Sequence, residues 1–427
     1  MTERLYSADS FLTNFDAVVA DIQEVSRASG QSLWRVALDR SAFYPTGGGQ
    51  PFDTGTLIAT SRSGAELTAE IVDVEEDEHG EVWHHTLKPL VAGTTVRGSI
   101  NAGRRLDYMQ QHSGQHLLSA AFIEICGART VSFHLGEASS TIDLDVDHLT
   151  TTMLEHVEER ANQIIAEDRP VTMSIVPREH AENLLAAGEL RKLPPRQGDL
   201  RIITIADFDR NACGGTHVRS TGQIGGLHLR GLEKVKQGLR VEFVCGLRAA
   251  RTARNDFNRL TAAARQLSVG FEEVPQAIQR LQADAKQTAK HTLKLTNELA
   301  QYHAAELIAQ TPVEAGLRQI QLQLTAANQV DASYAKLLAS KIAAHSVQTV
   351  AVIGWQPDDS ATPATVVLSR SGDLAFDCGT VLRTTLATHG GRGGGSKDMA
   401  QGSVAADQLQ TTLEELAAHC QATVLPR

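Results

Sequence analysis

The sequence predicts an α+β protein, and three patterns along the chain lead to this class. Strand-like runs separated by turns fill residues 1–97, helical and strand-like runs alternate over 98–248, and glycine nearly vanishes over 249–310. Such a succession of strand-rich and helix-rich stretches is typical of α+β architecture. A chain of 427 residues is long enough for several domains. We therefore predict a β-rich N-terminal domain (1–97), a mixed domain (98–248), a helical spacer (249–310) and a small α/β C-terminal domain (311–427).

The β-rich domain contains a glycine-rich stretch, "FYPTGGGQPFDTG", at residues 43–55. Pro45 and the three consecutive glycines predict a loop in which the backbone can approach a ligand closely. A long connection between two strands is the alternative interpretation of the same residue types.

The mixed domain should begin with a helix from Arg104 to Cys126. A strand and turn at 129–147, a helix at 151–168 and a strand at 171–177 follow from the periodicity. Residues 200–246 then predict strands around a glycine-rich loop that contains "NACGGTHV".

The predicted spacer carries apolar or small residues at every third or fourth position from Val274 to Tyr302. This heptad-like spacing predicts a long helix that serves as a spacer and is compatible with coiled-coil self-association. Lys286, Lys290 and Lys294 form a basic stripe on another face, which is most often simply solvated.

The C-terminal domain should contain a helix at 332–345, strands at 349–355 and 364–370, and a helix near 403–420. The stretch "HGGRGGGSKDMAQGS" (389–403) predicts a loop. Because Ser396 precedes Lys397, the residue order of a phosphate-binding Walker loop is absent, and no nucleotide cofactor is evident. The glycines around Arg392, including Gly394, suit close approach to a flat or anionic group, with a plain surface loop as the alternative.

The composition excludes several classes of protein. Apolar residues make up 42% of the chain and charged residues 21%, as in a soluble globular protein. No apolar run reaches the length of a membrane span and no signal sequence begins the chain, so we expect a cytoplasmic protein that does not enter the membrane. The cysteines are odd in number and scattered, which does not suit a disulfide framework and favours a ligand or nucleophile; they are Cys126, Cys213, Cys245, Cys378 and Cys420.

Charge is distributed unevenly. The formal net charge of −10 argues against nucleic-acid binding over the whole surface. Residues 186–254 nevertheless contain thirteen Lys or Arg and only six Asp or Glu. A basic region on an acidic protein indicates a local contact with a polyanion, although a solvated charged face would give the same count.

The motif "HSGQH" places His112 and His116 four positions apart within the first predicted helix. At helical pitch both imidazoles lie on one face and could bind one metal ion. An ordinary surface pair is the alternative. Ser113 stands where a zinc protease of the HExxH type has glutamate, so a metalloprotease is disfavoured.

A second pair, Cys213 and His217, lies in "NACGGTHV", where Gly214 and Gly215 favour a turn over a helix. Two short-spaced pairs from separate elements can close a tetrahedral site, and zinc favours mixed thiolate and imidazole ligands. Together the two pairs supply one thiolate and three imidazoles. Only folding can join them, because 97 positions separate His116 from Cys213.

The chain resembles the alanyl-tRNA editing proteins, which are freestanding relatives of the editing portion of alanyl-tRNA synthetase, in their long form with a C-terminal DHHA1 domain. The resemblance spans almost the whole chain and is carried by motifs in the family's order: "FYPTGGGQPFDTG", "HSGQHLL", "CGGTHV" with "STGQIG", and "HGGRGGGSKDMAQGS". It implies one Zn²⁺ per chain, in an editing domain at 98–248, with the ligands His112, His116, Cys213 and His217. It also implies tRNA binding and dimerisation through the DHHA1 domain.

By this resemblance the chain should hydrolyse the ester between a wrong amino acid, chiefly serine and also glycine, and the 3′ adenosine of alanine tRNA. The β-rich unit begins almost at once, with no preceding aminoacylation domain, so the chain should remove amino acids from tRNA and not attach them. Four protein ligands would fill a tetrahedral zinc, so the metal is expected mainly to position substrate.

Further site residues are expected around this centre. Ser132 and His134 would alternate onto one strand face after the first ligand helix, where they are the candidates to read the hydroxyl of serine and His134 could also orient water; an ordinary core or surface strand is the alternative. Asp209 is a candidate partner of a ligand histidine. Candidate contacts to the terminal adenosine are Gly47, Gly48, Gly49 and Gln50.

Two other functions remain open from the sequence. One is a tRNA-binding module whose zinc is purely structural, which the lack of an obvious general base keeps in contention. The other is a general zinc hydrolase of small esters, which the basic region and the C-terminal domain disfavour.

Overall fold

The computed structural model describes residues 1–28, 31–61, 63–195, 198–359 and 361–424. It combines helices and strands throughout, in agreement with the mixed class that the sequence predicts. The chain forms two compact units, Met1–Ala263 and Ala264–Arg427. No helix in the described ranges is long and apolar enough to cross a membrane.

The first unit begins with a closed barrel in the strand order β2-β3-β7-β6-β5-β8. Its strands are β2 (Asn14–Ala28), β3 (Gln31–Leu38), β5 (Gly55–Thr60), β6 (Glu66–Glu76), β7 (Val82–Thr86) and β8 (Thr95–Ile100). Alternate residues point inward, as in β8, where Val96 and Ile100 are buried and Gly98 leaves room for the ring of Phe15. A short helix α1 (Leu5–Ala8) and the parallel pair β1 (Glu3–Arg4) and β4 (Arg40–Ser41) flank the barrel.

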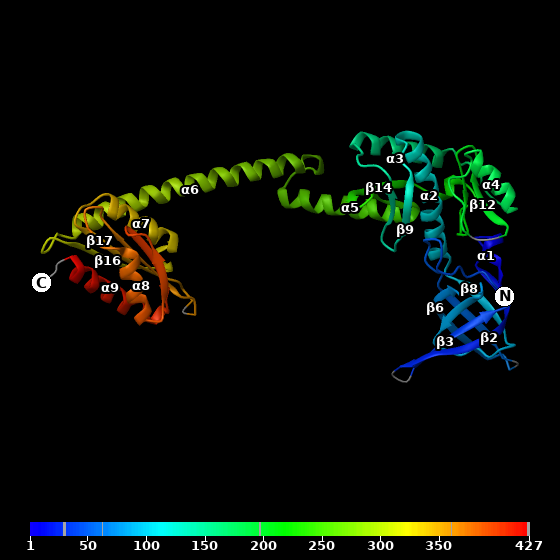
Figure 1. The fold of residues 1–427 in the computed structure, drawn as a ribbon, viewed down its shortest axis with the longest axis horizontal. Helices are drawn as coiled ribbons and strands as arrows, with labels where there is room; N and C mark the ends of the chain where they lie inside the picture. The colour runs from blue at the N-terminus through cyan, green and yellow to red at the C-terminus, as the bar shows by residue number, and fades with distance from the viewer. Residues whose placement is uncertain (29–30, 62, 196–197, 360, 425–427) are drawn as a thin grey trace. The chain divides into compact units, whose positions relative to one another are not determined.

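The helix α2 (Ala102–Cys126) leads from the barrel into the rest of the unit (Figure 1). Asn101 caps its first turn by accepting a hydrogen bond from the Arg104 N–H, and Gly127 ends it in the left-handed conformation. Most of its middle is buried on all sides. A Cβ at Gly114 would lie 2.3 Å from Cys245 Sγ, so glycine allows β15 to pack against the helix.

Two open sheets pack against α2. One has the order β14-β15-β10-β9, and the other has the order β11-β12-β13. Their strands and the neighbouring helices are β9 (Thr130–Leu135), β10 (Ser140–Leu144), β14 (Leu227–Val235), β15 (Gly238–Cys245), β11 (Val171–Val176), β12 (Leu200–Ile205), β13 (Asp209–Ala212), α3 (Thr151–Ala166) and α4 (Arg178–Ala186). The helix that carries "HSGQH" therefore touches both sheets, and the loop after β13 carries "CGGTH".

The helical stretch predicted at 249–310 is two helices, α5 (Gly246–Leu267) and α6 (Val274–Gln310), separated by residues 268–273. Ala300 and Ala304 of α6 are buried in the core of the second unit. The end of α6 is thus part of that unit. Its heptad-like positions Leu281, Leu295 and Tyr302 are exposed, and coiled-coil pairing through them remains a prediction.

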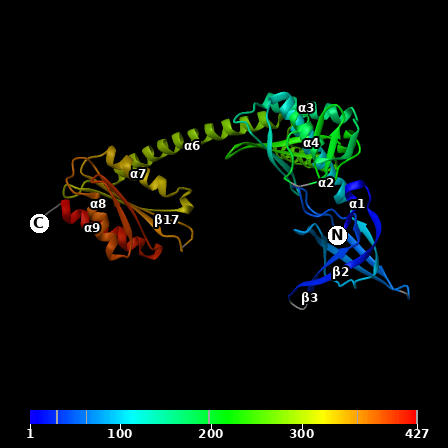
Figure 2. The same cartoon turned by 45° about the vertical axis from the view of Figure 1, so that its right-hand side comes forward.

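The second unit is a five-stranded sheet with helices on both faces (Figure 2). Along β17, Val350 and Val352 face the core formed with α8 and α9, while Ala351 and Ile353 face α7 and the end of α6. The sheet order is β16-β17-β18-β20-β19. The elements are β16 (Arg318–Thr325), α7 (Ala332–Ala344), β17 (Thr349–Gln356), β18 (Ala364–Arg370), α8 (Cys378–Thr388), β19 (Arg392–Gly395), β20 (Met399–Val404) and α9 (Leu409–Val424).

The prediction of a loop at 389–403 is wrong over most of its length, because β19 and β20 form there. A Cβ at Gly393 would lie 2.6 Å from Leu386 Cδ1 and 2.7 Å from the Gly402 Cα. A Cβ at Gly395 would lie 2.3 Å from the Met399 carbonyl oxygen. These two glycines therefore permit close packing of the edge strand on α8 and β20.

Candidate metal centre

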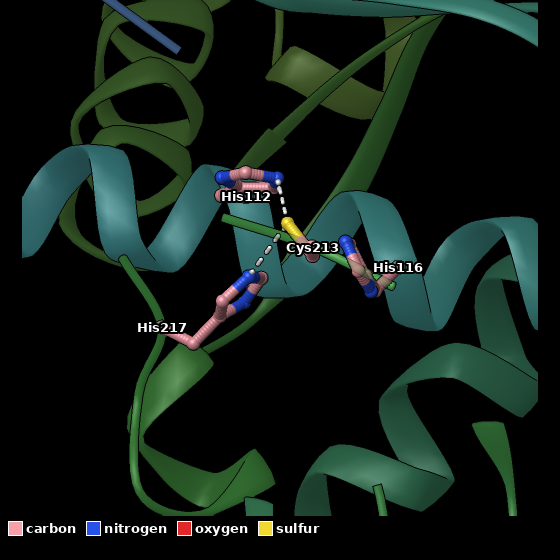
Figure 3. A group of neighbouring side chains, drawn as sticks. All are labelled: His112, His116, Cys213 and His217. Atoms are coloured by element: carbon pink, nitrogen blue, oxygen red, sulfur yellow. Dashed lines mark hydrogen bonds between the residues drawn. The ribbon is translucent and has the colours of Figure 1, made fainter. Parts of the chain in front are cut away.

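Four side chains from two distant segments converge at one point of the first unit (Figure 3). His112 and His116 lie one turn apart on α2, and Cys213 and His217 belong to the loop that follows β13. One ligand atom of each lies within 4.8 Å of the others. Cys213 Sγ is 3.4 Å from His112 Nε2 and 3.3 Å from His217 Nε2. The structure thus brings together the two pairs that the sequence analysis singled out.

The protonation states of the three imidazoles suit ligation. Burial, with a smaller contribution from the nearby Arg201, lowers the pKa of His112 to about 3. Burial, followed by the neighbouring imidazoles and basic groups, also puts the pKa values of His116 and His217 well below their usual range. All three rings are neutral at pH 7, which is the form that binds metal.

Gln50 fixes the orientation of His112. Its Oε1 accepts from the His112 Nδ1–H at 2.9 Å and from the Thr216 N–H at 3.1 Å, and its Nε2 donates to Thr216 Oγ1 at 2.8 Å. With Nδ1 protonated, the lone pair of Nε2 points to Cys213. Gln50 is only 1% exposed and holds His112 in this structure, while the predicted contact with the terminal adenosine stays a prediction.

Ser113, inside the "HSGQH" motif, orients His217. Its Oγ lies 3.1 Å from His217 Nδ1 and accepts from the Val218 N–H at 3.2 Å. The main-chain N–H of His217 donates to Ser10 Oγ at 3.2 Å. The tautomer with a proton on Nδ1 leaves Nε2 free toward Cys213.

His116 has a carboxylate beside its outer nitrogen. Its Nδ1 is buried without a hydrogen bond among the described residues, and Asp209 Oδ2 lies 3.8 Å away. Arg191 pairs with the other oxygen of Asp209. This separation is longer than a hydrogen bond. Asp209 therefore lies beside His116 without a direct hydrogen bond to it, and its role as the partner of a ligand histidine stays a prediction.

Arg201 and Gly215 shape the loop of the second pair. Arg201 Nη1 donates to the carbonyl oxygens of Cys213 at 3.0 Å and of Gly215 at 2.7 Å, and Nε donates to the Ser7 carbonyl at 3.1 Å. A Cβ at Gly215 would lie 2.2 Å from His112 Cε1, whereas one at Gly214 would meet nothing within 4 Å. Gly215 is therefore needed for the loop to approach the imidazole.

The donor set fits a zinc ion. One thiol and three neutral imidazoles match the borderline-soft character of zinc. Zinc bonds of about 2.3 Å to sulfur and about 2.0 Å to nitrogen put the two donor atoms roughly 3.5 Å apart in a tetrahedron, and the observed separations from Cys213 Sγ are close to this value. Burial raises the pKa of the Cys213 thiol, so a bound cation would have to displace its proton.

The other predicted site residues lie at varying distances from this centre. Phe133 of β9 has its ring centroid 5.7 Å from that of His112, and a Cβ at Gly49 would meet the Phe133 ring at 2.6 Å. Ser132 and His134 lie on the opposite face of the strand and are exposed, and Ser132 Oγ donates to Asp143. The structure therefore brings Phe133, and neither Ser132 nor His134, into contact with the four-residue cluster.

Gly47 and Gly48 sit in the tight turn before Gln50, where a Cβ at either would be in ordinary contact with the Tyr44 hydroxyl at 3.8 and 3.9 Å. Arg392 and Gly394 belong to the edge strand β19 of the second unit, where Arg392 is exposed. Sequence reasoning missed the roles of Ser113 and Arg201. For Ser113 the available signal was its position directly after the candidate ligand His112. Nothing in the sequence marked Arg201.

A stretch of each unit matches a known protein family. Residues 200–242 match the family described as the threonyl and alanyl tRNA synthetase second additional domain, and residues 319–422 match the DHHA1 domain. An alanine–tRNA ligase of Natronomonas pharaonis is 33% identical over 94% of this chain and 42% of its own length. The alanine–tRNA ligase of Halorubrum lacusprofundi is 32% identical over 97% of this chain and 43% of its own length. That of Pyrococcus abyssi is 30% identical over 94% of this chain and 42% of its own length.

The chain thus combines a barrel, a buried cysteine and histidine cluster, a stretch of the synthetase second additional domain and a DHHA1 domain. The chain belongs with the relatives of alanyl-tRNA synthetase and carries their editing-type and C-terminal domains. It spans less than half the length of the ligases named above.

Proposed function

We propose that the chain is a zinc-dependent deacylase that hydrolyses mischarged aminoacyl-tRNA, chiefly Ser-tRNA(Ala) and also Gly-tRNA(Ala), and so supports translational fidelity by editing in trans. The observation that carries the proposal is the buried cluster of three histidines and one cysteine, of which Cys213 and His217 lie within the stretch that matches the synthetase second additional domain. The ligands would be His112, His116, Cys213 and His217.

The physical need for such an activity is clear. A synthetic pocket for alanine cannot reject glycine or serine strongly, because these differ by one methyl or one hydroxyl group. A second site that hydrogen-bonds the serine hydroxyl leaves polar groups unpaired when alanine enters, and so spares the correct product.

The residues around the centre hold the ligands in one protonation state. Gln50 and Ser113 each take the Nδ1–H of a histidine, and Arg201 anchors the loop through two carbonyl oxygens. When bound, zinc supplies a Lewis acid that can hold or polarise a polar group of the substrate. Four protein donors fill a tetrahedron, so the proposed role of the metal is mainly positioning.

A non-catalytic tRNA-binding protein with a structural zinc is the second candidate. Four protein ligands are the rule in structural zinc sites, whereas catalytic sites usually keep one position open. Either candidate includes tRNA binding, and we further propose a cytoplasmic protein that can form a homodimer through its C-terminal region, where Arg392 and Gly394 are candidate RNA contacts.

The test uses the full chain with serine-, glycine- and alanine-charged alanine tRNA and with a simple ester, each with and without a chelator. Loss of serine that the chelator abolishes supports the deacylase, and binding without loss supports the second candidate. Cleavage of the simple ester alone would indicate a general hydrolase. Cys213→Ala should lose zinc and deacylation together, while Cys126→Ala, at the end of α2 and outside the cluster, should retain both. Full activity in zinc-free protein would contradict the proposal.

A further inference from the structure

A pocket of about 350 Å³ lies beside the candidate metal centre. The N-terminal segment (8–11), the strands β11 and β12, and residues 217–219 line it. His217 is shared between this pocket and the four-residue cluster. The volume is within the range of small-molecule sites.

The sheet face that forms the floor of the pocket is covered at Ile203, which is 2% exposed, and open towards the end of β11. The opposite face of β11 and β12 packs Leu200 and Ile202 against Ala181 of α4. On the pocket side, Met173 is paired with Ile203, and Ile175 with Arg201. Met173 is 37% exposed and Ile175 65%, so an apolar surface continues outward from the pocket.

Arg201 brings a positive charge to this floor without a compensating carboxylate. Its Nε and Nη1 are occupied by main-chain oxygens of Ser7, Cys213 and Gly215. Among the described residues, no carboxylate forms an ion pair with this guanidinium, and its hydrogen bonds from Nε and Nη1 all go to main-chain oxygens. A guanidinium in this state is suited to a phosphate oxygen.

The rim of the pocket carries a flat, cationic stack. The guanidinium of Arg219 lies 4.4 Å from the centroid of the Phe11 ring, and its side chain is 64% exposed. Asp9 Oδ1 accepts from Arg219 Nη2 at 3.0 Å and holds the group in place. Guanidinium planes and aromatic rings are the surfaces on which unpaired bases stack in RNA-binding proteins.

We propose that this pocket binds nucleotides of the single-stranded 3′ end of an RNA, with a base stacked on Arg219 and Phe11 and a phosphate at Arg201. Because His217 lines the pocket, a strand seated there ends next to the metal centre. The choice of RNA over another anionic ligand rests on the proposed function, whereas the stack of Arg219 on Phe11 and the guanidinium of Arg201 without a carboxylate partner are independent of it.

The experiment measures binding of an uncharged CCA trinucleotide and of an uncharged RNA hairpin with or without a 3′ CCA overhang, using the zinc-loaded full chain. Arg219→Ala and Phe11→Ala should each raise the Kd of the CCA-ended probes about tenfold, since stacking contributes about 1–3 kcal/mol per base. Arg210→Ala is the matched control, because Arg210 is also an ion-paired arginine near this sheet but lies outside the pocket. Its Kd should stay within about twofold of wild type.

Zinc content and urea midpoint show whether each variant is folded, and Arg219→Glu serves as a second surface variant if Phe11→Ala is unstable.

The experiment distinguishes failure of the pocket assignment from failure of the proposed deacylase function. Equal Kd values for wild type, Arg219→Ala and Phe11→Ala would overturn the pocket assignment even if the chain deacylates tRNA. Equal losses in all three alanine variants, Arg210→Ala included, would also overturn it by showing a diffuse charge effect. Weaker binding in the two pocket variants without any deacylation by wild type would keep the pocket and reject the deacylase. If both hold, the pocket variants should raise KM for the charged tRNA while kcat changes little.

Discussion

The role of Gln50 gives a sharp prediction, because this amide joins the barrel-side loop to the candidate metal centre. Gln50→Ala removes the acceptor of two buried donors, His112 Nδ1–H and Thr216 N–H. Each buried donor left without a partner costs about 1–3 kcal/mol. We therefore expect the free energy of unfolding of the zinc-free protein to fall by roughly 2–6 kcal/mol, twice that cost.

Zinc affinity should fall as well. Without Gln50, the His112 ring loses the hydrogen bond that fixes its tautomer, and residues in this position typically contribute 10- to 100-fold to metal affinity. That range corresponds to about 1.4–2.7 kcal/mol of binding free energy. Competition with a chromophoric chelator measures the affinity, and urea unfolding without metal measures the stability.

Gln110→Ala is the matched control for this experiment. Gln110 is a buried glutamine that donates to the Gln223 carbonyl and accepts from the Leu247 N–H, and it touches none of the four candidate ligands. It should lose stability and keep its zinc affinity. Wild-type zinc affinity in Gln50→Ala, or equal loss of affinity in both variants, would refute the reasoning.

Three further predictions concern other parts of the chain. Gly215→Ala should lose zinc, measured by metal analysis, because its Cβ would lie 2.2 Å from an imidazole carbon, whereas Gly214→Ala should retain the metal. Burial lowers the pKa of His84 to about 4, below its unfolded value of about 6.5, so its contribution is full above pH 6.5 and is lost as the pH falls towards 4. The loss amounts to about 3 kcal/mol, and urea unfolding at pH 7.5 and pH 5 should show a smaller difference for His84→Asn than for wild type. Gly393→Ala should lower the thermal midpoint of the second unit, while Gly394→Ala, with only Arg383 Nη2 at 4.0 Å, should leave it unchanged.

The sequence predicted the elements in which periodicity and end signals agree. The helix expected at 151–168 is α3, which begins after Thr150, whose hydroxyl accepts from the Met153 N–H. The strands β19 and β20 escaped prediction because a run of glycines has no apolar alternation. These strands form because glycines without a Cβ leave room for atoms of α8 and β20 to pack closely. The strand sequence alone does not show these neighbours.

The candidate metal centre, like the fold, was predictable from the sequence only in part. Spacing alone paired His112 with His116 and Cys213 with His217, because candidate ligands four positions apart can be recognised directly in the sequence. The sequence singled out Gln50 as an adenosine contact, which stays a prediction, but it did not reveal the hydrogen bond to His112, since a glutamine amide does not show which group it will hold. Alternation along β9 was predicted correctly, but the sequence could not say that the face toward His112 carries Phe133.

A buried ion pair explains why the glycine-rich loop at 43–55 belongs to the centre. Arg105 of α2 is 1% exposed, pairs with Asp53 of this loop, and donates to the carbonyl oxygens of Ser10 and Ala42. Removing one partner leaves a buried charge uncompensated at about 3–5 kcal/mol. Arg105→Met should therefore destabilise the protein by that amount.

The same variant should weaken zinc binding, because Gln50 lies on the loop that Arg105 holds. Replacing both partners, Arg105→Met with Asp53→Leu, should recover much of the stability, since an apolar pair can replace a buried ion pair. It should not recover the zinc affinity, because the loop still lacks its anchor to the main-chain oxygens. Zinc affinity that follows stability in both variants would mean that the loop reaches His112 without this anchor, and the barrel would then be a neighbour of the metal centre and not a part of it.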